Sequence, residues 1–218
     1  MSGYITYWSK DYVKQLKKHN DNGPFRVVYG SQHTRMPYIT KVKVGDIIYP
    51  VTIKEHTLCV MARLPIDVIE PAYDYLMRET GKRFAALLPE GILLQKNSIY
   101  GQFNTFSGGS GYTGKVTLPD NIHTVIQEES LVEKPHLFHQ EPITCCAKNA
   151  ASGSNGSSIL ERIIPLGTAV TFRFGSTPSS QKPLKLDKDG YITSLSLSGF
   201  VRKMDDAAFD YFEKLFDE

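Results

Sequence analysis

Aromatic side chains alternate with basic ones in the first fifty residues, and this combination of residue types suits the binding of nucleic acid. An aromatic ring can stack on a base, while a lysine or arginine can hold the neighbouring phosphate. Trp8 is the only tryptophan and lies beside a polar run, so we expect it to line a pocket. We expect most of the other rings in the core, because aromatic residues are also common in strands. The aromatic residues concerned are Tyr4, Tyr7, Trp8, Tyr29, Tyr38 and Tyr49.

The net charge of +2 is distributed unevenly along the 218 residues. Residues 1–54 hold nine Lys or Arg and three Asp or Glu, which gives +6, so the rest of the chain carries −4. A basic lobe attracts phosphate backbones. The alternative is that surface charge is uneven without any partner, because a charged patch does not require a ligand.

One segment partly matches the phosphate-binding loop of nucleoside triphosphatases. Gly109 is followed after four residues by Gly114 and Lys115. The full motif needs Ser or Thr next, to ligate magnesium, and a helix after it. Val116 stands there instead, and Pro119 disfavours a helix. The sequence therefore argues against a triphosphatase.

Several residues of zinc-ligand type lie close together, but their spacing does not favour a metal site. Adjacent cysteines rarely bind one ion, and the usual Cys-x2-Cys spacing is missing, so we predict no metal and no cofactor. A cysteine with a histidine could also serve as nucleophile and base, although the sequence selects no such pair. The residues are His136, His139, Cys145 and Cys146, with Cys59 as a further candidate.

Composition places the chain among ordinary globular proteins. It is 41% hydrophobic and 22% charged, and three cysteines argue for a reducing compartment rather than a disulfide framework. No apolar run approaches the length of a membrane span, and the N-terminus has no apolar signal core. We therefore expect a cytoplasmic protein, or a nuclear one in a eukaryote, that does not bind membranes.

The elements that must position these residues follow from hydrophobic periodicity and turn residues. We expect a hairpin over 47–53 and 57–63, and a final helix capped by Asp205. Ser9 is the expected cap of a helix with Val13 and Leu16 on its apolar face. Further helix is expected at 66–80, and further strands at 3–8, 25–29, 142–147, 159–164, 169–174 and 191–204. No linker separates two domains, so the sequence predicts one α+β domain.

The two ends of the chain resemble an EVE domain of the PUA-like superfamily, a relative of YTH and ASCH domains. The resemblance rests on a Tyr-Trp strand, a Ser-Lys-Asp helix start, a Gly-Asp turn before a strand, and a closing strand and helix. These motifs are Tyr7-Trp8-Ser9-Lys10-Asp11-Tyr12-Val13, Phe25, Tyr29-Gly30, Val42-Lys43-Val44-Gly45-Asp46-Ile47-Ile48-Tyr49, Met61-Ala62-Arg63, Leu197-Ser198-Gly199-Phe200 and Met204 to Phe209. The resemblance implies a small, bent β-barrel with flanking helices. It implies a single PUA-like domain over 1–218, with an insertion or elaboration at about 85–185.

The resemblance also implies a pocket for a modified or extruded base. At matched positions Trp8 would be the stacking wall, with Ser9 and Lys10 beside it. Their closeness to the basic segment adds Ser31 and Gln32 as partners of the base edge. For the same reason Arg35 and Lys41, with Lys10, are expected to hold phosphates.

From these features we expect a nucleic-acid-binding module for DNA or RNA. Two alternatives remain open at this point. One is an enzyme that acts on a nucleotide or a small amide, with a site built from residues 97–160. The other is a protein-interaction domain that uses its loops and acidic tail. The sequence does not identify a catalytic residue or the oligomeric state.

Overall fold

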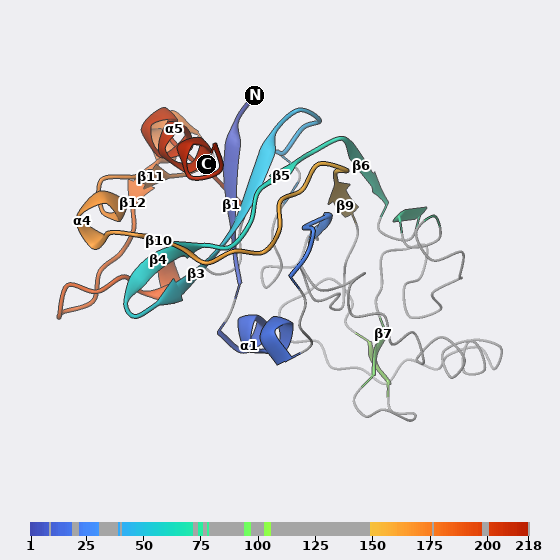
Figure 1. Cartoon of the computed structure of the whole chain (residues 1–218), viewed down its shortest axis with the longest axis horizontal. Helices are drawn as coiled ribbons and strands as arrows, with labels where there is room; N and C mark the ends of the chain where they lie inside the picture. Colours follow the sequence, from blue (N-terminus) through green and yellow to red (C-terminus); the bar gives the residue numbers. More distant parts are fainter. Residues whose placement is uncertain are drawn as a thin grey trace.

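A computed structural model describes residues 1–8, 10–18, 22–30, 39, 41–71, 74, 75, 78, 94–96, 103–105, 149–175, 177–197 and 201–217. Strands predominate in this part of the chain, and a few short helices flank them (Figure 1). The expected α+β class is therefore confirmed. The strand expected at 142–147 lies outside the described residues.

The main sheet brings the two ends of the chain together. Its strand order is β10 (Arg162–Ile164), β4 (Thr57–Val60), β3 (Ile47–Lys54), β1 (Gly3–Tyr7) and β13 (Arg202–Lys203), and β5 (Leu64–Pro65) also pairs with β3. The β1–β3 pair is parallel, and the other pairs are antiparallel. Within the described residues these strands do not close into a barrel.

The expected hairpin is confirmed, and its turn is tight. Glu55 and His56 connect β3 to β4 with φ values of 48° and 64°. Two consecutive positive φ values are typical of a type I′ turn, whose twist matches that of the strands. Pro50 lies in the middle of β3, where a proline cannot donate to the ladder. Its carbonyl accepts from the Met61 amide (2.8 Å), so Pro50 faces the point where the partner strand is interrupted between β4 and β5.

A second sheet has the order β2 (Val27–Gly30), β9 (Asn149–Ser152) and β6 (Val68–Pro71). The prediction of a helix from residue 66 is wrong for Val68–Pro71, because these residues pair with β9 instead. Only Asp74, Tyr75 and Arg78 of the expected helix are helical in the described part. Both β9 and β10 lie inside the range 85–185, so part of that range contributes strands to the two sheets. Two further strands of the same range, β7 (Leu94–Lys96) and β8 (Phe103–Thr105), pair with each other in a separate small sheet.

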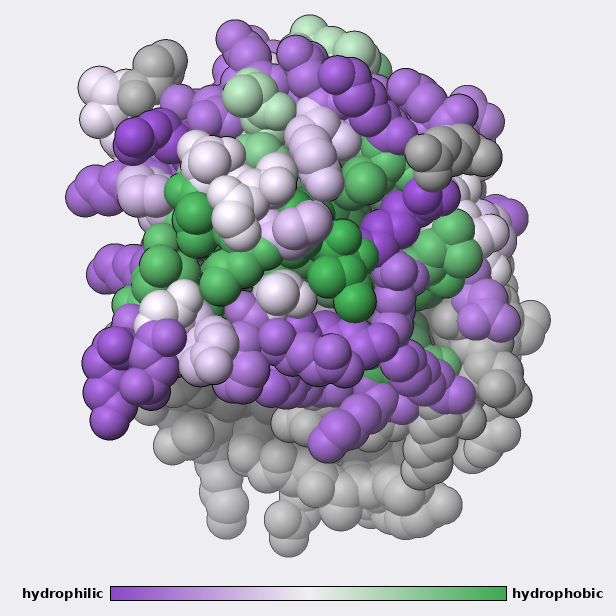
Figure 2. Space-filling model, turned by 60° about the vertical axis from the view of Figure 1, so that its left-hand side comes forward, coloured by the Kyte–Doolittle hydropathy of each residue, from purple (hydrophilic) through white to green (hydrophobic). Residues whose placement is uncertain are grey.

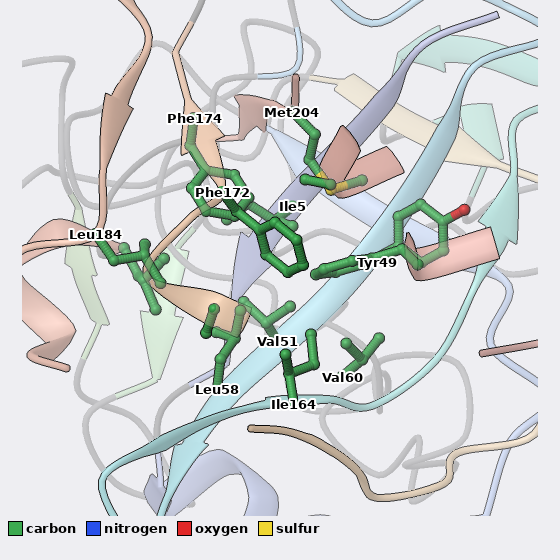
Figure 3. Packing of buried hydrophobic residues seen from close by; sticks show 14 of the residues in the cluster. Ile5, Tyr49, Val51, Leu58, Val60, Ile164, Phe172, Phe174, Leu184 and Met204 are labelled. Carbon is green, nitrogen blue, oxygen red and sulfur yellow. The ribbon is translucent and has the colours of Figure 1, made fainter. Parts of the chain in front are cut away.

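The main sheet is covered on both faces. Along β3, Ile47, Tyr49, Val51 and Ile53 point into a first core, whereas Ile48 points into a second. Figure 3 shows the first core, where Phe172, Phe174 and Met204 pack beside Ile5 and Tyr49. The second core lies between the main sheet, α1 (Lys10–Lys18) and the second sheet. Val13 and Leu16 are buried beneath α1 while Lys14 and Lys17 are exposed, as predicted.

Helix α5 (Asp206–Lys214) covers the first core. The Asp205 carboxylate accepts from the Ala208 amide (2.9 Å), so the predicted cap is confirmed. Ala208 and Phe212 are fully buried, and Phe209, Leu215 and Phe216 pack against the core, as expected. Seen from the side of α5, apolar side chains gather in the middle of the face, with polar side chains around them (Figure 2).

The segment before α5 is less regular than its sequence indicates. A single strand over 191–204 is wrong, because Ser194–Ser196 forms a 3-10 turn and only Arg202–Lys203 forms strand β13. The strand expected over 169–174 is wrong in its first half, because Ala169 ends the short helix α4 (Leu166–Ala169) and the next two residues form a turn. The part that forms a strand is β11 (Arg173–Phe174), which pairs with β12 (Lys182–Pro183). A second 3-10 turn covers Pro178–Ser180. The strand expected over 159–164 is confirmed at β10.

Two glycines allow the loop after β9 to pack tightly. A Cβ on Gly153 would lie 1.9 Å from the carbonyl oxygen of Pro65, and a Cβ on Gly156 would lie 1.5 Å from that of Phe25. Any larger residue would therefore push the loop away from Pro65 and Phe25. No helix in the described part is long and apolar enough to cross a membrane.

Candidate nucleic-acid interface

Trp8, the expected wall of a base pocket, is a core residue. Only 1% of its surface is exposed, and its ring meets Phe25 edge to face with ring centroids 5.6 Å apart. Its amide donates to the Val51 carbonyl (2.8 Å), which extends the β1–β3 ladder by one residue. The indole therefore has no open face on which a base could stack.

Of the other expected site residues, the structure describes only Lys10 and Lys41. Lys10 and Lys41 are exposed at the surface. The Lys41 carbonyl accepts from the Tyr4 hydroxyl (3.0 Å), which ties this segment to β1. Ser9, Ser31, Gln32 and Arg35 lie outside the described residues.

A hollow with charged side chains on its rim lies at the end of β9 and has a volume of about 210 Å³. It is bounded by the residue before β2, the start of β6, the turn after β9 and the helical residues beyond β6. Its lining residues are Arg26, Asp67, Val68, Tyr75, Arg78, Ser152, Gly153 and Ser154. Drug-sized ligands need about 300–1,000 Å³, so this hollow suits a smaller group.

Backbone hydrogen bonds hold the rim of the hollow in place. The Asp67 amide donates to the Ser152 carbonyl (2.8 Å), and the Gly153 amide donates to the Arg26 carbonyl (3.0 Å). The close approach of Gly153 to Pro65 fixes the same turn. Three segments that are distant in the sequence are thus joined at one point, which makes the rim a rigid support for the side chains.

Asp67 offers a hydrogen-bond acceptor to the hollow. Its Oδ2 accepts from the amide (2.7 Å) and the hydroxyl (2.8 Å) of Ser154. These two hydrogen bonds lower the pKa of the Asp67 carboxyl, the bond from the amide more than the other, so the group is ionised at neutral pH. Among the described residues no donor reaches its second oxygen, Oδ1, which is therefore available to a ligand.

Two guanidinium groups supply donors to the hollow. Arg26 is exposed, and in the described part of the chain no hydrogen bond or ion pair holds its side chain. Arg78 is held by Glu70, whose two oxygens accept from Nη1 at 2.5 and 2.7 Å. Its Cζ also lies 5.4 Å from the centroid of the Tyr75 ring, which is 3% exposed. Arg78 is thus presented as a fixed, flat cation, and Arg26 as a movable one.

Sequence reasoning missed this hollow. Arg26 counted only as part of the basic first quarter, and Asp67 and Arg78 were assigned to a helix. Ser154 belongs to a Gly-rich stretch that reads as a plain loop. The one usable signal was the pair of glycines at 153 and 156, since glycine often marks a close approach of two backbone segments.

A second charged cluster joins α5 to the main sheet and is structural. Glu213 accepts from Arg63 through Nε (2.6 Å) and Nη2 (2.8 Å), and from the Tyr49 hydroxyl. Burial raises the pKa of the Glu213 carboxyl, but the hydrogen bonds from Arg63 and Tyr49 outweigh burial, so the pKa is lowered overall. Burial also raises the pKa of Tyr49. The cluster is filled by its own members, so it fixes the helix rather than binding a ligand.

Two further chemistries were considered from the sequence, a thiol nucleophile and a metal site. Cys59 is fully buried, and burial raises the pKa of its thiol to about 11, which makes it a poor nucleophile. The described residues contain no group of three metal-ligating side chains. His136, His139, Cys145 and Cys146 lie outside those residues.

Comparison of the chain with family models, with curated proteins and with solved structures finds no match.

Proposed function

We propose that this protein is a nucleic-acid-binding module that takes one extruded base or nucleotide into the hollow at the end of β9. The observation that carries the proposal is the meeting of Arg26, Arg78 and the ionised Asp67 at a hollow of single-base size. A base edge and its sugar present donors as well as acceptors, so a ligand of this kind needs both a carboxylate and guanidinium groups.

Each side chain has a distinct part in this proposal. Arg26, whose guanidinium is exposed, pairs with a phosphate, which arginine binds in bidentate fashion. The guanidinium plane of Arg78, supported by Tyr75 and held by Glu70, is the wall on which the base stacks. Asp67 Oδ1 accepts a hydrogen bond from the base edge or from a ribose hydroxyl. In this arrangement Arg78 takes the place that the sequence assigned to Trp8.

The proposal agrees with the resemblance to EVE domains, which implies a PUA-like barrel and a base pocket. The parallel β1–β3 pair at the centre of the sheet, and the pairing of the chain's two ends through β1 and β13, are the observations that support this agreement. The finer identification as a PUA-like reader of modified bases is part of the proposal.

Fluorescence polarisation with labelled single-stranded and double-stranded oligonucleotides tests the proposal, with the salt concentration varied. We expect Arg26→Gln to weaken binding by about 1.5–3 kcal/mol, because a charge-assisted hydrogen bond is lost. The slope of log K against log salt should fall by about one. Arg173→Gln, the same change at an exposed position on β11, is the matched control and should bind as the parent does.

Asp67→Asn separates recognition from simple attraction of phosphate. If Asp67 accepts a hydrogen bond from the ligand, the variant binds more weakly and the salt slope is unchanged. Stronger binding by the variant would mean that Asp67 only repels phosphate. Absence of binding by the parent protein, to plain and base-modified oligonucleotides alike, would refute the proposed function.

A further inference from the structure

Two aromatic rings lie stacked on the surface, far from the hollow. His56 is in the β3–β4 turn, and Tyr191 follows the turn at Gly190. Their ring centroids are 4.2 Å apart, with 30° between the planes. Tyr191 is 41% exposed, His56 is exposed as well, and neither belongs to one of the two cores. Core packing therefore does not explain the pair.

Both rings are carried by short, fixed turns. Asp187 Oδ1 accepts from the amides of Asp189 and Tyr191, each at 2.9 Å, and the Asp187 amide donates to the Tyr191 carbonyl (2.8 Å). His56 is held by the type I′ geometry of its own turn. The two turns, 54–57 and 187–191, are called the hairpin tips below. Since their backbones are fixed, a base that stacks on the pair meets a surface prepared in advance.

Lysines lie on or next to the two turns. Lys54 and Lys17 both pair with the one carboxylate of Glu161, so a positive charge remains there. Lys188 lies within the second turn and Lys185 lies two residues before it, and neither has an ion pair in the described part of the chain. Three acidic residues, Glu55, Asp187 and Asp189, lie on the same turns. The net charge is therefore small, and the rings must supply most of any affinity.

We propose that the hairpin tips bind unpaired bases of a single-stranded nucleic acid. Stacking on aromatic rings accepts every base but requires that the base be out of a duplex, which selects single strands. For its ligand class this inference rests on the proposed function, but it uses different residues. Figure 1 shows the β3–β4 turn at the lower left and the β6–β9 pair at the upper right, so the two surfaces are separate.

The probes are a labelled oligo(dT) strand, an oligo(rU) strand and a blunt duplex, measured with the full chain. We expect Tyr191→Leu to weaken binding of both single strands about 5- to 150-fold, the loss measured for one stacked base, and to leave the duplex unchanged. Tyr191→Phe keeps the ring and should bind as the parent does. His56→Asn, which tolerates the positive φ, should weaken single-strand binding as well. The salt slope should stay the same in all three variants.

The results separate this inference from the proposed function. If Tyr191→Leu and His56→Asn bind single strands like the parent while Arg26→Gln does not, the stacking surface is refuted and the hollow stands. If Arg26→Gln binds like the parent while Tyr191→Leu is weakened, the hairpin tips are the site and the hollow is refuted. Equal losses for single strand and duplex in Tyr191→Leu would also refute selective stacking. If the parent binds no probe, both proposals fail.

Discussion

Trp8 gives the sharpest test of the structure, because its expected surface role and its observed core position predict opposite results. Trp8→Ala removes the largest fully buried side chain of the described residues. Truncation of a buried Phe or Trp to Ala costs about 3–5 kcal/mol, since both the transfer energy and the cavity count against the fold. Trp8 is 1% exposed and packs on Phe25, so we expect Trp8→Ala to lower the stability by an amount within this range and not below it.

For a domain of this size about 1 kcal/mol shifts the melting temperature by 2–4 °C, so Trp8→Ala should melt about 6–20 °C below the parent. Circular dichroism measures this shift. In Trp8→Phe the ring fills part of the cavity, so its melting temperature should fall clearly less than that of Trp8→Ala. Because Trp8 is the only tryptophan, the emission of the parent also reports on this one site.

We expect blue-shifted emission and poor quenching by acrylamide in the folded protein, and a red shift on unfolding. The reasoning would be refuted if Trp8→Ala melted within about 2 °C of the parent, a shift that corresponds to less than 1 kcal/mol. Emission at the water-exposed wavelength before unfolding would refute it equally. Either result would mean that Trp8 is exposed, as the sequence predicted, and that it could line a base pocket.

Two further changes test the loop after β9 and the anchor of α5. Gly156→Ala should destabilise the fold by more than the ordinary 0.5–3 kcal/mol of a point mutation, because the new methyl would meet the Phe25 carbonyl oxygen; chemical denaturation that gave a neutral change would contradict this packing. Glu213→Gln should lower stability at neutral pH, because the lowered pKa of Glu213 means that folding favours its charged form beside Arg63. The contribution of the charge is complete above the ordinary Glu pKa of about 4.3 and disappears as the pH falls through the pKa of the folded state. The free energies of unfolding of the parent and the variant should therefore become equal in acid. A difference in stability that stayed constant from neutral to acidic pH would show that the charge is not involved.

The elements that the sequence predicted correctly are those whose contacts lie between residues close together in the chain. The β3–β4 hairpin follows from alternating hydrophobic residues on either side of a short turn. The cap at Asp205 and the apolar face of α5 follow from helical periodicity. In each of these cases the partners lie within a few residues, so spacing alone contains the information.

The misassigned segments depend on distant partners instead. Residues Val68–Pro71 continue a pattern that fits a helix, but Val68 pairs with Ser152, which lies 84 residues further along the chain. Sheet pairing and burial override a weak helical preference. The hollow depends on the same contact, because Asp67 and Ser154 meet only when β6 and β9 pair. The glycines at 153 and 156 mark a close approach of the backbone, but they do not indicate which distant segment they approach.

The burial of Trp8 follows from alternation along β1 once the sheet is known to be covered on both faces. Ile5 and Tyr7 face the first core, so Tyr4 and Trp8 face the second. Strand β1 pairs on both edges and is packed by a core on each face, so its first four residues are buried. Ligand-binding groups in such a sheet must come from strand ends and turns, where side chains can reach solvent. The hollow at the end of β9 and the hairpin tips are such places. The proposed contacts therefore lie there, and not at Trp8, which the sequence predicted as the stacking wall.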